Sequence, residues 1–227
     1  MNTLIINGSP LGQNGNTEIF IRRFIEGTGQ DYLVRYAAKE SAETLAQAAV
    51  QADILLIFMP LYVYAMPGIV MKLLERMVPA KKGQKIGFVV QAGFIEGAQA
   101  RFLVSYLNAF AERMGYENLG VITKGDAAAT RFLPIFMNRK LFKRLRLLGA
   151  HYARHGLFHK KTAELLAGMY EIPPQKARLY EFLHRTGINN MIWHKFWRKN
   201  GVFAQGLDRP FAPIISNSIR ESLANVE

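Results

Sequence analysis

Cysteine is absent from all 227 residues of the chain. This absence excludes disulfide bonds, thiolate zinc sites, cysteine-ligated iron–sulfur clusters and catalysis by a thiol. The first residues also lack the basic run and the apolar stretch of a secretory signal peptide. We therefore expect a cytoplasmic protein without thiol chemistry.

An uninterrupted apolar run long enough to cross a membrane is lacking too. Residues 54–71 carry no charged side chain and match the length of a bilayer-spanning helix. However, Pro60, Pro67 and Gly68 interrupt the run, and a continuous helix tolerates that pattern poorly. The segment is interpreted as a buried strand, a loop and the beginning of a helix.

Acidic residues are scarce in the second part of the chain. Residues 1–130 carry 12 Lys and Arg against 11 Asp and Glu, whereas residues 131–227 carry 17 against 6. The second part therefore creates a positive field that favours anionic ligands, membranes or nucleic acid. No RNA- or DNA-binding motif is visible, so nucleic acid is not expected as a partner.

Apolar runs alternate with helical patterns through the first 125 residues. The predicted strands and helices occupy residues 3–7, 17–27, 31–36, 41–51, 53–58, 68–77, 85–91, 98–114 and 117–123. The strands are continuous apolar runs, which is typical of a parallel sheet buried on both faces. The sequence therefore predicts an α/β fold with a five-stranded parallel sheet that is covered by helices on both faces.

The remaining residues indicate irregular helical structure. A helical face is predicted from the spacing of Met137, Leu141, Leu145, Leu148 and Tyr152. The basic helix that carries this stripe, over residues 139–154, permits three interpretations. The first is an amphipathic helix with a solvated outer face. The second is a surface that binds anionic lipid, and the third is a site that attracts the phosphates of a ligand.

Three histidines recur every four residues in the same region. His151, His155 and His159 would align on a continuous helix and could then bind a metal ion. Gly156 interrupts the helix, however, and no carboxylate accompanies the row. We therefore prefer a polar helical face and predict no metal site.

The most informative stretch is the loop that follows the first predicted strand, from Asn7 to Thr17. The loop precedes a helix, whose N-terminus offers unpaired N–H groups and the positive end of its dipole to a phosphate. It contains no lysine after its last glycine and no G-x-G-x-x-G motif, so it matches neither the nucleoside-triphosphate loop nor the dinucleotide fingerprint. A plain strand–turn–helix connection is the alternative interpretation.

Two further loops follow predicted strands at the same edge of the sheet. The segment from Pro60 to Gly68 offers aromatic rings and backbone amides, and the segment from Gln91 to Gly97 offers glycines that allow close backbone approach. In an open parallel sheet, ligands bind beyond the carboxyl ends of the strands where the strand order reverses. Taken alone, each segment could instead be an ordinary turn.

Together, the three loops resemble those of the flavodoxin-like NAD(P)H-dependent FMN reductases and quinone reductases, over about residues 1–125. The resemblance implies a flavodoxin-like fold, a doubly wound five-stranded parallel sheet in the order 2-1-3-4-5. We expect an FMN-binding domain at residues 1–155 and a helical C-terminal extension at residues 156–227, packed on that domain or swapped from it. The resemblance also implies a homodimer. The implied FMN-binding residues are Ser9, Asn14, Asn16 and Thr17 at the phosphate; Pro60, Leu61, Tyr62, Val63 and Tyr64 at the ring edge; and Ala92, Gly93 and Phe94 on the far side of the ring.

The resemblance implies an enzyme that uses FMN to pass electrons from NAD(P)H to a quinone, a flavin or a similar small acceptor. The alternative is a flavodoxin-like electron carrier or FMN-binding partner module. The basic second part favours the enzyme. It also raises peripheral attachment to the anionic inner face of the membrane as an alternative to a purely cytoplasmic location.

Overall fold

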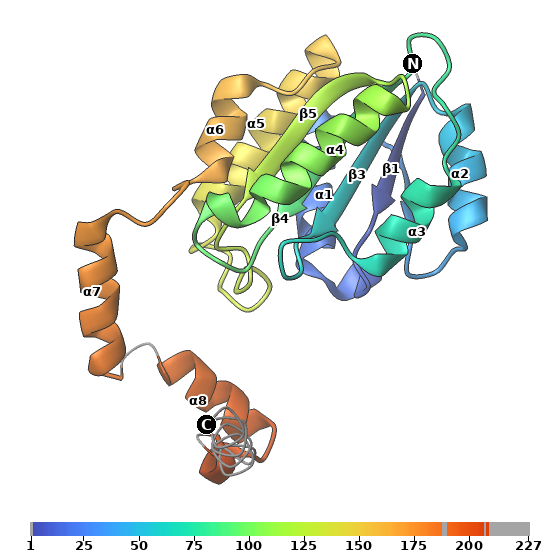
Figure 1. Cartoon of the computed structure of the whole chain (residues 1–227). Coiled ribbons are helices and arrows are strands. Elements are labelled where there is room, and N and C mark those ends of the chain that lie inside the picture. The colour runs from blue at the N-terminus through green and yellow to red at the C-terminus, as the bar shows by residue number, and fades with distance from the viewer. Residues whose placement is uncertain (1, 188–189, 207, 209–227) are drawn as a thin grey trace, which may run out of the picture. The chain divides into compact units, whose positions relative to one another are not determined.

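A computed structural model describes residues 2–187, 190–206 and 208. Its centre is one parallel sheet in the order β2-β1-β3-β4-β5 (Figure 1). The strands are β1 (Thr3–Asn7), β2 (Leu33–Tyr36), β3 (Ile54–Pro60), β4 (Lys85–Gln91) and β5 (Glu117–Lys124). Strand content, direction and order confirm the predicted fold. Every residue of β1 and β3 is buried, which explains why these strands are continuous apolar runs.

Helices cover both faces of the sheet (Figure 1). The core on one face is completed by α2 (Ala42–Gln51), α3 (Gly68–Arg76) and α4 (Arg101–Arg113). The core on the other face is completed by α1 (Asn16–Thr28), α5 (Arg139–His155) and α6 (Lys160–Ala167). None of the described helices is long and apolar enough to cross a membrane.

Two glycines allow α1 and α5 to cross at backbone contact. A Cβ atom added to Gly149 would lie 2.0 Å from the carbonyl oxygen of Phe24. A Cβ atom added to Gly27 would lie 2.0 Å from the carbonyl oxygen of Arg146. No side chain fits at either position without separating the helices.

The strand register brings several loops to one edge of the sheet. Asn7 pairs with Phe58, Pro60 with Gln91, and Gln91 with Lys124. Main-chain hydrogen bonds continue the ladder into the loops, from the Gly8 amide to the Phe58 carbonyl (2.8 Å) and from the Leu61 amide to the Gln91 carbonyl (2.7 Å). The backbone after each strand is therefore fixed where the loops begin.

The chain divides into two compact units after Ile172, whereas the predicted boundary lies at residue 155. The first unit is longer because α6 packs on the sheet and the chain after it is held by Gly97 and Ala98, whose amides donate to the Met169 and Tyr170 carbonyls (2.8 and 2.9 Å). The second unit contains α7 (Pro174–Arg185), α8 (Asn190–Lys199) and the 3-10 turn η3 (Phe203–Gln205). Residues 209–227 of the predicted extension lie outside the described residues, and how the extension packs stays a prediction.

The three histidines lie close together although α5 ends at Gly156. The ring of His151 lies 4.4 Å from that of His155 and 4.6 Å from that of His159, between centroids. Among the described residues, no group of three or more His, Cys, Asp or Glu side chains is placed to hold a metal ion.

Candidate functional site

A cavity of about 470 Å³ lies at the edge of the sheet where β1, β3 and β4 end. Nine of the twelve predicted site residues line it. The complete lining is Ser9, Leu11, Asn16, Pro60, Leu61, Tyr62, Val63, Gln91, Ala92, Gly93, Phe94, Ala127 and Ala128. The structure therefore brings the three predicted loops to one cavity and adds a fourth segment, at residues 127–128.

The side chain of Asn7 organises the first loop, which includes the short 3-10 turn η1 (Gly12–Asn14). Its Oδ1 accepts a hydrogen bond from the Ser9 amide (3.0 Å). Its Nδ2 donates to the Gly12 carbonyl (3.3 Å) and to Oε2 of Glu18 (3.1 Å). Asn7 is fully buried, so these bonds form away from water and fix the path of the loop.

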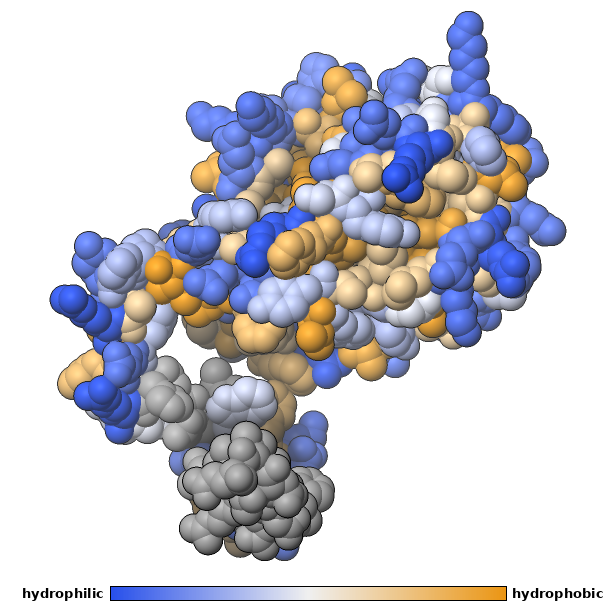
Figure 2. Space-filling view, viewed as in Figure 1, coloured by the Kyte–Doolittle hydropathy of each residue, from blue (hydrophilic) through white to orange (hydrophobic). Residues whose placement is uncertain are grey.

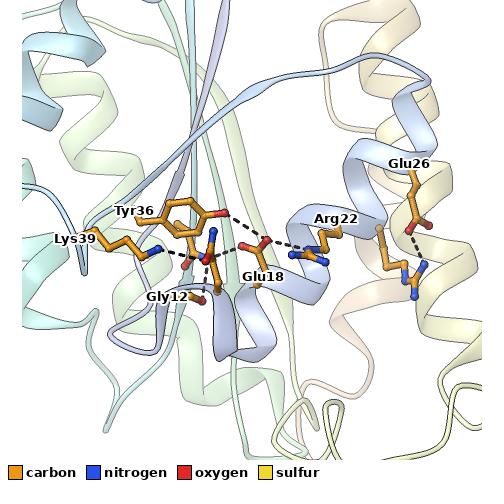
Figure 3. Close-up of polar contacts among 9 residues, drawn as sticks. Gly12, Glu18, Arg22, Glu26, Tyr36 and Lys39 are labelled. Atoms are coloured by element: carbon orange, nitrogen blue, oxygen red, sulfur yellow. Dashed lines mark hydrogen bonds and ion pairs between the residues drawn. The ribbon is translucent and has the colours of Figure 1, made fainter.

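Glu18 completes this buried network from the first turn of α1 (Figure 3). Its carboxylate also accepts hydrogen bonds from Nε of Arg22 (2.9 Å) and from the Tyr36 hydroxyl (3.4 Å). The sequence analysis missed Glu18 because an acid is common in the first turn of any helix. Its position directly after the predicted loop was the one feature of the sequence that could have identified Glu18 as part of the site.

Ser9 presents a buried hydroxyl at the mouth of the loop. Its Oγ accepts a hydrogen bond from the Leu11 amide (3.2 Å), which leaves the hydroxyl hydrogen for a ligand. A Cβ atom added to Gly15 would lie 2.9 Å from this Oγ, so the close approach depends on glycine. The loop thus combines a hydroxyl donor with the N-terminus of α1, as an anion requires.

Gln91, the last residue of β4, lines the cavity and carries a buried polar atom without a partner among the described residues. Its Nε2 donates to Oγ1 of Thr17 (2.8 Å), and the residue is only 7% exposed. Within the described part of the chain, its Oε1 is a buried oxygen without a hydrogen-bond partner. Such an atom is costly to leave unpaired, so a ligand that donates a hydrogen bond there would be stabilised.

The second loop forms a strained turn. The amides of Tyr62 and Ala65 donate to each other's carbonyls (2.8 and 3.0 Å), while Val63 and Tyr64 adopt φ angles of 46° and 67°. Positive φ at both central residues is typical of a type I′ turn and is unfavourable for a β-branched residue. Tyr62 lines the cavity, whereas the Tyr64 ring packs against Phe102, with 6.4 Å between centroids.

A fourth segment, between β5 and α5, is attached to the first loop. The side-chain amide of Asn16 donates to the carbonyls of Ala127 (2.8 Å) and Ala128 (3.1 Å) and accepts from the Arg131 amide (3.0 Å). The Arg131 guanidinium donates to the Asn14 carbonyl (3.1 Å). The Asn16 side chain is therefore occupied in joining two loops, and Arg131 adds a cation beside the first loop.

Three predicted residues lie outside the cavity wall. Asn14 is exposed on the loop and contacts Arg131 through its carbonyl, Thr17 lies behind Gln91, and Tyr64 faces Phe102. The sequence analysis did not predict Gln91 or Arg131. Gln91 is a polar residue at the end of an apolar strand, and Arg131 lies more than 110 residues from the loop it contacts.

Half-buried Lys124 is the last residue of β5 and lies near the third loop. Burial lowers the pKa of its ammonium group, which donates a hydrogen bond to the Gly125 carbonyl. The neighbouring charges act in opposite directions, since Asp126 raises the pKa and Arg144 lowers it. Lys124 does not line the cavity.

No protein-family model matches the sequence, and no curated protein matches it. The fold is similar to solved structures. NAD(P)H:quinone oxidoreductase from Methanothermobacter marburgensis is 14% identical and aligns over 68% of this chain and 98% of its own, with a TM-score of 0.53. General stress protein 14 from Treponema denticola, in complex with FMN, is 13% identical over 68% and 98%, with a TM-score of 0.52.

The apo form of an NADH:FMN oxidoreductase is 14% identical over 77% of this chain and 97% of its own, with a TM-score of 0.51. Likeness at this level of identity establishes the fold. The class that the fold defines is flavodoxin-like, with the cavity at the strand ends where such sheets bind ligands.

Proposed function

We propose that this protein is an FMN-dependent oxidoreductase that passes electrons from NAD(P)H to a small acceptor such as a quinone or a flavin. The observation that carries the proposal is the cavity itself. It joins an anion-binding loop at the N-terminus of α1 to an aromatic loop and to an unpaired buried oxygen of Gln91. These features suit a ligand with a phosphate at one end and a flat heteroaromatic ring at the other.

The described residues fit FMN at both ends. The Ser9 hydroxyl, the N-terminus of α1 and the Arg131 guanidinium would hold the phosphate. Tyr62 and the backbone of the second and third loops would hold the ring, and Oε1 of Gln91 would accept a hydrogen bond from it. The names of similar structures, which include an FMN complex and two NAD(P)H oxidoreductases, agree with this ligand.

FMN, when bound, supplies the electron transfer that links NAD(P)H to a second substrate. The protein itself then needs no nucleophile. Its residues bind and orient the ring, and the exposed Tyr62 side chain at the cavity wall would position or cover it. The homodimer that the resemblance implies and the expected cytoplasmic location belong to the same proposal, and analytical ultracentrifugation would test the dimer.

The decisive experiment is a visible spectrum of the protein purified without added cofactor, followed by release of any chromophore. We expect a yellow protein that yields FMN and is bleached anaerobically by NADH or NADPH. Tyr62→Ala should weaken FMN binding or slow turnover about tenfold through lost contact area. Tyr106→Ala, at an exposed tyrosine of α4 outside the cavity wall, is the matched control and should change neither.

A colourless protein that does not bind added FMN would refute the proposal. A protein that binds FMN but is reduced by neither NADH nor NADPH would instead support the flavodoxin-like electron carrier.

A further inference from the structure

The segment between β5 and α5, residues 125–138, is folded around two buried polar residues, Thr130 and Asn138. The buried side chain of Asn138 donates hydrogen bonds to the carbonyls of Thr130 (2.9 Å) and Leu133 (3.5 Å). Backbone turns close it, from the Met137 amide to the Pro134 carbonyl (3.0 Å) and from the Asn138 amide to the Ile135 carbonyl (3.1 Å). The segment is therefore a defined structure with a polar centre.

Its outer surface is apolar. Ile135, Phe136 and Met137 are 71%, 68% and 57% exposed. We call these three residues the apolar tip. Met137 was predicted to share one helical face with Leu141 and Leu145, but α5 begins at Arg139, so Met137 belongs to the preceding turn. Three consecutive large apolar side chains in water are unfavourable, and exposed apolar patches of this kind mark binding surfaces.

The chain around the tip is rich in positive charge. Residues 125–163 contain nine Lys and Arg against one acidic residue, Asp126. Exposed Arg139, Lys140 and Lys143 lie in the first two turns of α5. Cations at a helix N-terminus oppose the helix dipole, so the dipole does not explain the position of these residues.

We propose that the apolar tip and these three cations dock the protein on an anionic lipid surface. Apolar side chains that enter the acyl boundary, combined with cations that reach the head groups, are the pattern of interfacial membrane binding. A second copy of the chain would bring the same positive charge to a symmetric contact and be repelled. Nucleic acid would use the cations but leave the apolar tip in water.

The tip lies on the edge of the sheet that carries the cavity. Ala127 and Ala128, which begin the same segment, line the cavity, and Asn16 holds them to the first loop. Figure 1 shows the segment below the strand ends, and the space-filling view shows hydrophobic residues along this lower edge of the domain (Figure 2). Docking through the tip would place the cavity next to the lipid surface.

Vesicle flotation of the full chain tests the proposal. We expect binding to vesicles of phosphatidylcholine with phosphatidylglycerol at low salt, and much less to phosphatidylcholine alone. The double variants Ile135→Ser/Phe136→Ser and Lys140→Glu/Lys143→Glu should each bind about tenfold more weakly, since one removes insertion and the other attraction. All four substituted side chains are exposed, so the variants should fold like the unchanged protein, and circular dichroism checks this.

Matched controls lie away from this edge. Leu33→Ser changes an exposed leucine of β2, and Lys81→Glu/Lys82→Glu reverses two exposed charges before β4. Both should float like the unchanged protein. Absence of wild-type binding to the anionic vesicles would overturn the proposal, as would full binding by the Ile135→Ser/Phe136→Ser variant. A third outcome would also overturn the proposal: the unchanged protein does not bind lipid, and the Ile135→Ser/Phe136→Ser variant loses a dimer that the unchanged protein forms. That outcome would assign the tip to self-association.

Discussion

At the scale of single residues, the polar side chains of the site divide between holding the loops and facing the cavity. Asn7, Glu18 and Asn16 use their hydrogen bonds on neighbouring backbone and side chains. Ser9, Gln91 and Arg131 retain donors or acceptors for a ligand. The first set determines the shape of the site, and the second set determines what binds there.

Arg131 provides a test that separates phosphate binding from ring binding. Because its guanidinium lies against the first loop, Arg131→Gln should weaken FMN binding about tenfold through loss of a charge-assisted bond. Riboflavin, which lacks the phosphate, should bind equally well to both proteins. Fluorescence titration measures both affinities, and Arg139→Gln is the control for a lost positive charge. An equal loss for riboflavin would show that Arg131 only shapes the loop.

The strained turn of the second loop yields a prediction on stability. Val63→Asn/Tyr64→Gly replaces two residues at positive φ by the pair that type I′ turns prefer. Relief of this strain should raise the free energy of unfolding by about 1–2 kcal/mol. Urea denaturation measures it, and an unchanged midpoint would mean that the Tyr64–Phe102 contact offsets the strain.

Most cavity residues that follow a strand were predictable from the sequence, but Gln91 at the end of β4 was missed, and so was Arg131, which arrives from a distant segment. Ser9, Tyr62 and Gly93 directly follow strands, so the topology places them at the cavity. Arg131 reaches the same place through folding of a segment that has no motif of its own. The outward direction of Tyr64 depends on a turn type that its sequence does not favour.

At the scale of elements, the strands were predictable because their apolar runs reflect burial on both faces. The start of α5 was less predictable. Apolar spacing extends through Met137, but Pro134 and the buried Asn138 side chain form a turn before the helix. Periodicity alone does not distinguish an exposed turn residue from the first residue of a helix face.

The crossing of α1 and α5 depends on glycine. Gly149→Ala would place a methyl group against the Phe24 carbonyl and should lower the free energy of unfolding by about 1–3 kcal/mol. Gly68→Ala is the matched control, because Gly68 is in α3 with open space around its Cβ position. That change should be neutral or stabilise by up to about 1 kcal/mol. Chemical denaturation compares the two, and equal effects would contradict the close crossing.

At the scale of the whole molecule, the hydrogen bond between Thr3 and Tyr152 (2.8 Å) joins the first strand to α5. Burial raises the pKa of Tyr152 to about 12. The protonated form is therefore favoured on folding, so its contribution is present below about pH 10, the ordinary tyrosine pKa, and is lost as the pH rises towards 12.

Tyr152→Phe should cost about 1 kcal/mol at neutral pH through loss of this bond. Between pH 10 and 12 the difference between the two proteins should shrink, because the variant has no phenol to ionise at this position. Unfolding titrations at pH 7 and pH 11 measure the difference. A gap that widened with pH would contradict the burial of this hydroxyl.

If both proposals hold, the three hydrogen bonds of the Asn16 side chain would make cofactor binding and membrane docking thermodynamically dependent on each other. They attach the first loop to the segment that carries the apolar tip. A ligand that orders one loop lowers the entropy lost when the other is ordered, which produces cooperativity without a change of shape. Flavin saturation would then raise the affinity for anionic lipid, and lipid would raise the affinity for flavin by the same factor, since such linkage is reciprocal.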